Sequence, residues 1–181
     1  MRGVLHICVA VWLALVAMPL EAGPAGVWLD VPFVAQPEDG CGAASAAMVM
    51  QYWERDLHLE HSARANVETI QSALYSKSEK GILASALEGY LKDSGYRTFA
   101  VRGEWQDMRS HIAKGRPLIV SLAPAGPRHA LHYVVVAGVD ADEQAVFVND
   151  PAQRKLLRIA RMDFEKQWHD AGDWMLLALP E

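Results

Sequence analysis

The sequence predicts an α+β fold in which a helical half precedes a mostly antiparallel sheet. Two observations support this class. Before Pro117, apolar residues recur mainly at helical spacing between helix-stop signals, whereas after Pro117 short β-branched runs alternate with turn residues. Because the helices and strands are segregated along the chain, the sheet is expected to be mostly antiparallel. A length of 181 residues predicts one domain with a sizeable core, over residues 23–181.

Residues 1–22 are typical of a secretory signal peptide. Arg2 supplies a short positive region, the run Val4–Met18 is nearly all apolar, and cleavage is expected after Ala22. An uncleaved membrane anchor is the alternative, but the apolar run is short for a span of about 20 residues and His6 interrupts it. We therefore predict export to the periplasm or beyond, with no membrane attachment after cleavage.

Charge and cysteine content narrow the classes of function. The net charge is −5 and no basic block occurs anywhere, so neither nucleic acid nor an anionic membrane surface is an expected partner. Of the two cysteines, Cys8 lies within the predicted leader, which leaves Cys41 alone in the mature chain. An exported protein with one cysteine has no internal disulfide, and a single cysteine in that setting indicates a reactive thiol.

The elements before Pro117 follow from periodicity and capping residues. Pro32 marks the first strand as an edge strand, Asn66 is a typical N-cap, and Ser94-Gly95 and Gly115 are helix stops. The expected elements are an extended strand over Val27–Val34, helices over Cys41–Arg55, Asn66–Tyr75, Ile82–Leu91 and Trp105–Lys114, and a strand over Tyr96–Val101.

The elements after Pro117 are mostly short strands. Runs rich in Val, Ile and Leu are separated by turn residues, which is typical of an antiparallel sheet. Strands are expected over Leu118–Leu122, His132–Val139, Val146–Asp150, Leu156–Ile159 and Trp174–Leu179, with turns over Pro124–Pro127 and Asp140–Glu143 and a helix over Met162–His169.

Cys41 is the candidate nucleophile. It follows a loop of turn-forming residues and opens a run with good helix propensity, so it is expected in the first turn of a helix. There, unpaired backbone N–H groups and the positive end of the helix dipole favour a thiolate. The flanking Gly40 and Gly42 would let a substrate backbone approach the sulfur, and the Gln36 amide with the Cys41 N–H could hold an oxyanion. The alternative is a buried cysteine that only packs at the start of a core helix.

A cysteine nucleophile needs a histidine that accepts and returns a proton, and usually a third group that orients the imidazole. His132 is the first residue of an otherwise apolar strand, and His129 is the alternative base. Asp150 ends the next strand, and hairpin pairing would bring it beside His132. A purely structural turn before proline is the alternative role for Asp150. Because side chains alternate between faces of a strand, only one of Asn149 and Asp150 can point at His132. Asp140, at the far end of the histidine strand, is a weaker rival for the orienting role.

A series of motifs occurs in one order along residues 30–155, nearly the whole mature chain. The series consists of Gln36, Gly40-Cys41-Gly42-Ala43-Ala44, Met48, Gly81-Ile82-Leu83, Gly95-Tyr96, Gly115-Arg116-Pro117-Leu118-Ile119, His132-Tyr133-Val134-Val135-Val136 and Asp150-Pro151. It resembles the papain-like, bacteriocin-processing peptidases that cut leader peptides after a double glycine. The resemblance implies a papain-like cysteine proteinase fold, in which the helix that carries the nucleophile packs on a C-terminal antiparallel sheet.

The same resemblance implies roles for four residues: Cys41 as nucleophile, His132 as base, Asp150 as orienter and Gln36 as oxyanion-hole donor. The best-known members are fused to a membrane transporter with an ATPase, and this sequence contains no G-x-x-x-x-G-K-[ST] loop. We therefore expect a free-standing relative that acts on another exported protein.

The predicted function is a cysteine endopeptidase that hydrolyses an exported protein or peptide precursor, such as a component of a secretion system. No metal or organic cofactor is expected, because His58 and His61 lack a nearby third ligand and are expected on the solvated surface. Two alternatives stay open. The same thiol chemistry could serve amide transfer or transpeptidation. The fold could instead serve as a non-catalytic chaperone or binding module for a secretion substrate, although an intact nucleophile, base and orienter favour an enzyme.

Overall fold

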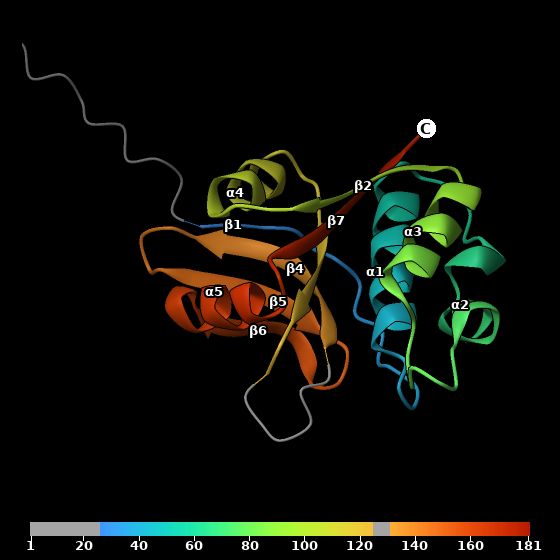
Figure 1. Ribbon diagram of the computed structural model, residues 1–181. Coiled ribbons are helices and arrows are strands. Elements are labelled where there is room, and N and C mark those ends of the chain that lie inside the picture. The colour runs from blue at the N-terminus through green and yellow to red at the C-terminus, as the bar shows by residue number, and fades with distance from the viewer. Residues whose placement is uncertain (1–25, 125–130) are drawn as a thin grey trace, which may run out of the picture.

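The computed structural model describes residues 26–124 and 131–181, and it confirms the α+β class (Figure 1). The predicted leader, His129 and all but the first residue of the predicted turn over Pro124–Pro127 lie outside the described residues. In chain order the elements are β1 (Val27–Trp28), α1 (Cys41–Asp56), a 3-10 helix (Ala63–Ala65), α2 (Val67–Leu74), α3 (Ala84–Asp93), β2 (Tyr96–Arg102), α4 (Trp105–Ala113), β3 (Leu118–Leu122), β4 (His132–Asp140), β5 (Ala145–Asp150), β6 (Arg154–Ala160), α5 (Arg161–Asp170) and β7 (Trp174–Pro180).

Helices α1, α2 and α3 form one group beside the sheet (Figure 1). The N-terminal half of α1 is a run of small residues, Gly42–Ala47, all of which are buried, so the helix backbone packs closely against its neighbours. As predicted, the Asn66 side chain caps α2 by accepting a hydrogen bond from Thr69 N at 3.0 Å. Gly95 follows α3 with φ +89°, a conformation that favours glycine and stops the helix.

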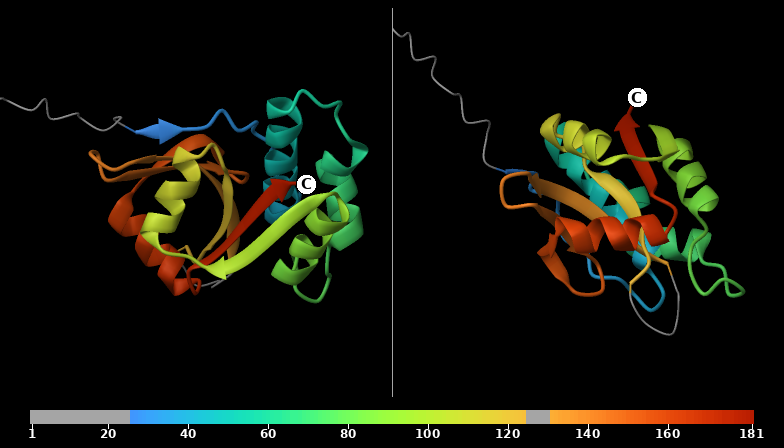
Figure 2. Two further views of the ribbon diagram at one scale, coloured as in Figure 1. Left: turned by 90° about the horizontal axis from the view of Figure 1, so that it is seen from above. Right: turned by 60° about the vertical axis from the view of Figure 1, so that its left-hand side comes forward.

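The strands form one antiparallel sheet in the order β2-β7-β3-β4-β5-β6, with β1 paired to β4. The last strand of the chain, β7, therefore lies between β2 and β3. Figure 2 shows β2 and β7 reaching from the rest of the sheet toward the helical group. The sheet thus extends into the half of the molecule that the helices occupy.

Each face of the sheet packs into its own apolar core. Val135 and Leu176 belong to the core shared with α1 and α3, which we call the first core. Their neighbours Val134 and Leu177 belong to the core shared with α4 and α5, which we call the second core. Because side chains alternate between faces and both faces are covered, the central strands are apolar at nearly every position.

Three elements differ from their predicted bounds by two or more residues at one end or both. The strand predicted over Val27–Val34 pairs only at Val27–Trp28, since the chain then leaves the sheet toward α1. Helix α3 begins at Ala84, because Leu83 is still extended with ψ 142°. Strand β6 is longer than the predicted Leu156–Ile159 and includes polar residues that face solvent. In the described part of the chain, no helix is both long and apolar enough to cross a bilayer.

Candidate active site

Cys41 is the first residue of α1, and its thiol is free and partly exposed. The chain turns just before it, where Gly40 N donates to Pro37 O at 3.0 Å, and Ala44 N then starts the helical ladder by donating to Gly40 O at 3.0 Å. A Cβ at residue 40 would come within 2.6 Å of the Pro37 ring, so the turn requires glycine. Gly40, the N-cap residue, has no side chain with which to cap this end of α1, so the first backbone N–H groups and the helix dipole are available to act on Cys41.

His132 begins β4 and lies between Cys41 and Asp150. Its Nε2 is 2.8 Å from Asp150 Oδ1, and Cys41 lies close enough to the imidazole for its charge to raise the pKa of His132. Because Nε2 contacts the Asp150 carboxylate, Nδ1 is the ring nitrogen that is available to the Cys41 sulfur. Burial lowers the pKa of His132, but the hydrogen bond with Asp150 and the negative charges of Asp150 and Cys41 outweigh it and raise the pKa from 6.5 to about 9. The imidazole is therefore protonated at neutral pH.

Asp150 ends β5, and both of its carboxylate oxygens accept hydrogen bonds. Oδ1 accepts from Ala152 N at 2.9 Å as well as from His132, and Oδ2 accepts from the Gln153 side chain. Burial raises the pKa of Asp150, but the hydrogen bond and charge of His132, with the bonds from Ala152 and Gln153, hold it below the ordinary 3.8. The sequence left two alternative roles for Asp150, a turn before Pro151 and a contact with His132. In the structure Asp150 has both.

Gln153 is a site residue that the sequence analysis missed. Its side chain donates to Asp150 from three residues downstream, across the turn that Gln153 N closes on Asp150 O at 2.9 Å. The available signal was the spacing Asp-Pro-x-Gln, because a four-residue turn brings its first and last side chains together.

Tyr133 is a second residue that the sequence analysis missed, and it lies beside Cys41. A Cβ on Gly42 would come within 3.3 Å of the Tyr133 ring and within 3.1 Å of Ile82. Burial, and then the negative charge of Cys41, raise the pKa of Tyr133 to about 12. Its ring also meets Trp174 edge-on, with centroids 5.4 Å apart. The phenol therefore stays protonated beside Cys41.

Gln36 lies at the end of the stretch that leads from the sheet to α1. Its backbone N donates to Pro151 O at 3.0 Å. Its side-chain Oε1 is enclosed, and its amide makes no hydrogen bond with any residue that the structure describes. A buried polar atom without a partner is uncommon and calls for a functional explanation.

Asn149 and Asp140, the alternatives to Asp150 as the residue that orients His132, make hydrogen bonds to other groups. The Asn149 side chain turns away from His132 and bonds Val31 O, Pro32 O and Leu156 N. Asp140 accepts hydrogen bonds from Asp142 N and Glu143 N within the β4–β5 turn.

The histidine pair considered as a metal site is on the surface. His58 is exposed, and His61 is exposed while its Nδ1 lies 2.6 Å from Glu54 Oε2. Within the described ranges, no group of three or more His, Cys, Asp or Glu side chains is arranged to hold a metal ion.

Solved structures with the same fold include several peptidase domains. A C39-like peptidase from Bacillus anthracis is 18% identical, with a TM-score of 0.65 over 87% of this chain and 99% of that one. The peptidase domain of Streptococcus ComA, a bifunctional ABC transporter, is 18% identical, with a TM-score of 0.64 over 83% and 99%. A double-glycine-motif protease from an AMS/PCAT transporter, solved with a leader peptide, is 20% identical, with a TM-score of 0.65 over 88% and 100%.

These neighbours confirm the predicted papain-like fold, since all are peptidase domains of the C39 type. No curated protein matches the chain in sequence. Residues 28–174, however, match the Peptidase_C39 like family and include every site residue described above. The chain belongs to the Peptidase_C39 like family.

Proposed function

We propose that this chain is a cysteine endopeptidase in which Cys41, His132 and Asp150 act as nucleophile, base and orienter. The observation that carries the proposal is the 2.8 Å contact between the His132 imidazole and the Asp150 carboxylate, with Cys41 close enough to the same imidazole to raise its pKa. A protonated imidazole next to a thiol at a helix N-terminus stabilises the thiolate, which is the nucleophilic form.

The reaction follows from these positions. The Cys41 thiolate attacks the peptide carbonyl carbon, and the carbonyl oxygen takes the negative charge. His132 gives its proton to the leaving amine as the C–N bond breaks, which leaves a thioester on Cys41. Neutral His132 then takes a proton from water, whose oxygen attacks the thioester. The acid product leaves, and the thiolate is restored beside the imidazolium.

Gln36 is proposed as the donor that holds the oxyanion, together with the Cys41 backbone N–H. Support comes from its amide, which has no partner among the described residues although its oxygen is enclosed. A donor kept free for a charge that appears only in the transition state is the arrangement that accelerates the chemical step.

The proposed substrate is an extended segment of an exported protein or peptide precursor. A related protease was solved with a leader peptide bound, which supports a peptide as the substrate class here. We also propose that residues 1–22 direct export and are removed, and that the substrate belongs to a secretion system. N-terminal sequencing of protein recovered from the periplasm, with Gly23 as the expected first residue, tests the export proposal.

The rate at which iodoacetamide alkylates Cys41, measured across the pH range, tests whether His132 activates this thiol. His132→Ala should slow alkylation of Cys41 at neutral pH, because a protonated imidazole beside a sulfur favours its nucleophilic form. A slow rate that is the same in both proteins would contradict the proposal and leave a non-catalytic binding module as the better account. Addition of amine nucleophiles to a peptide digest separates hydrolysis from amide transfer.

A further inference from the structure

An extended stretch, residues 29–36, connects the sheet to the helical group, and we call it the crossing segment. Its first residue donates its N–H to Ala137 O at 2.6 Å, and its last residue, Gln36, donates its N–H to Pro151 O at 3.0 Å. Because α1 begins only five residues later, the crossing segment determines how both Gln36 and Cys41 approach the sheet.

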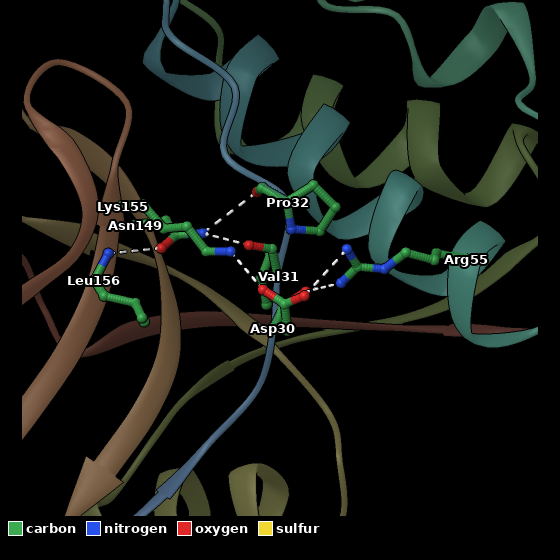
Figure 3. Close-up of polar contacts among 7 residues, drawn as sticks. All are labelled: Asp30, Val31, Pro32, Arg55, Asn149, Lys155 and Leu156. Carbon is green, nitrogen blue, oxygen red and sulfur yellow. Dashed lines mark hydrogen bonds and ion pairs between the residues drawn. The ribbon is translucent and has the colours of Figure 1, made fainter.

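Asn149 holds the middle of the crossing segment (Figure 3). Its Nδ2 donates to Val31 O at 3.1 Å and to Pro32 O at 3.3 Å, while its Oδ1 accepts from Leu156 N at 3.0 Å in β6. The Asn149 residue is 0% exposed. One side chain thus joins three backbone groups from two separate parts of the chain.

An amide is the only side-chain group that fits this position. Two carbonyl oxygens on one side require N–H donors, and a backbone N–H on the other side requires an acceptor. A carboxylate at residue 149 would face the two carbonyl oxygens of Val31 and Pro32 with an oxygen. Truncation would leave buried polar groups without partners, which is costly.

A second set of contacts holds the same segment at the surface. Asp30 lies between Arg55 in α1, with Arg55 Nη1 at 3.3 Å from Asp30 Oδ2, and Lys155 in β6 (Figure 3). The Asp30 and Arg55 side chains are 74% and 51% exposed, so water and salt weaken this attraction. The enclosed Asn149 contacts are therefore the ones expected to fix the segment.

We propose that Asn149 is a positioning residue that sets Gln36 at the place where the oxyanion forms. Asn149, Asp150 and Pro151 are consecutive, and each holds a different part of the site. Asn149 holds the crossing segment, Asp150 orients His132, and Pro151 O binds the Gln36 backbone. This inference rests on the proposed function, but it makes a separate claim: Asn149 serves the oxyanion donor and not the ion pair at Cys41.

Two reactions of the same thiol separate these roles. Alkylation by iodoacetamide forms no oxyanion and reports only on Cys41 and His132. Acylation by p-nitrophenyl acetate passes through an oxyanion and therefore also depends on Gln36. Asn149→Ala and Gln36→Ala should each slow acylation by about 100- to 1,000-fold, while the alkylation rate and its pH profile stay at wild-type values.

The double variant Asn149→Ala/Gln36→Ala gives the decisive comparison. If Asn149 acts through Gln36, the double variant should be no slower in acylation than the slower single variant, because the same interaction is lost only once. Losses that multiply, or an Asn149→Ala protein that is slowed equally in alkylation and acylation, would overturn the proposal. Failure of the proposed function itself would show differently, as slow alkylation in the wild type that does not depend on His132.

Controls keep the test valid if truncation harms folding. Asp30→Ala removes the exposed contacts to the crossing segment but leaves Asn149 intact, so both reactions should remain at wild-type rates. If Asn149→Ala does not fold, Asn149→Ser provides a milder change, since its shorter side chain loses the pair of carbonyl contacts but keeps a polar group. Near-ultraviolet circular dichroism identifies variants that are folded before their rates are compared.

Discussion

The His132–Asp150 pair shows how burial decides the weight of an individual contact. The two side chains are 22% and 6% exposed, so solvent screens their attraction only weakly. Arg102 and Asp173 approach equally closely, at 2.8 Å, but the Arg102 side chain is 71% exposed and the pair is expected to add little. The His132–Asp150 pair in the candidate active site is therefore the one expected to affect both the reactivity of Cys41 and the free energy of unfolding.

The stability that this pair provides should depend on pH. The folded-state pKa of His132, about 9, lies above its ordinary 6.5, so its contribution is complete below pH 6.5 and is lost as the pH rises through about 9. The pKa of Asp150 is lowered, so its contribution is present above its ordinary 3.8 and is lost as the pH falls below that value. The difference between 6.5 and about 9 corresponds to about 3 kcal/mol.

Urea unfolding of the wild type and Asp150→Asn at pH 5.5 and pH 10 measures this effect. The variant should lose more free energy of unfolding at pH 5.5 than at pH 10, by about 1–3 kcal/mol. Arg102→Ala serves as the comparison, because its exposed pair should give a small loss at either pH. An Asp150→Asn penalty of the same size at both pH values would contradict the assignment.

At the level of elements, local signals in the sequence sufficed for the start of α1 and for the β4–β5 hairpin. The glycine-flanked cysteine and the position of Asp150 at a strand end each depend on neighbours along the chain. Of the contacts that were missed, Gln153 with Asp150 is local, whereas others join residues that are distant in sequence, such as Gly42 with Ile82 and Tyr133. Periodicity specifies which residues form an element, but it does not specify which distant side chains meet there.

Replacement of two helical glycines by alanine should have different effects on the free energy of unfolding, because distant side chains lie beside only one of them. A Cβ on Gly42 would come within 3.1 Å of Ile82 and 3.3 Å of Tyr133, whereas a Cβ on Gly89 in α3 meets nothing within 4 Å. Gly89→Ala should raise the free energy of unfolding by about 0.5–1 kcal/mol, because alanine favours the helix.

Gly42→Ala should show less of that gain, since Ile82 or Tyr133 must move. It should also slow alkylation of Cys41, which Gly89→Ala should leave unchanged. Thermal unfolding and iodoacetamide kinetics on both variants check the pair. An equal gain in stability with unaltered kinetics would show that the space beside Gly42 is not restricted.

For the whole molecule, one sheet joins two apolar cores, whereas the sequence predicted only one domain with a sizeable core. Strand β7 contributes to both, and Trp53 Nε1 in α1 donates to Ala178 O in β7 at 2.9 Å. The sequence identified β7 as a strand but not its place between β2 and β3, because pairing between distant strands leaves no local signal. The two cores are expected to unfold together.

Adjacent leucines on β7 test this cooperativity. Leu176 is 1% exposed in the first core and Leu177 is 5% exposed in the second. Leu176→Ala and Leu177→Ala should each lower the free energy of unfolding by about 2–4 kcal/mol. Each should also keep a single transition, with circular dichroism and tryptophan fluorescence changing together. Separate transitions in either variant would show that the cores are independent.

The place of β7 also has a consequence for biosynthesis. A ribosome makes β2 and β3 well before residues 174–180, yet β7 is the strand that fills the space between them. Until residues 174–180 leave the ribosome, β2 has no strand to pair with and one edge of β3 stays open. A nascent or prematurely terminated chain therefore contains Cys41, His132 and Asp150 without the finished sheet that supports them. The time at which residues 174–180 are made therefore sets when Cys41 acquires the surroundings described above.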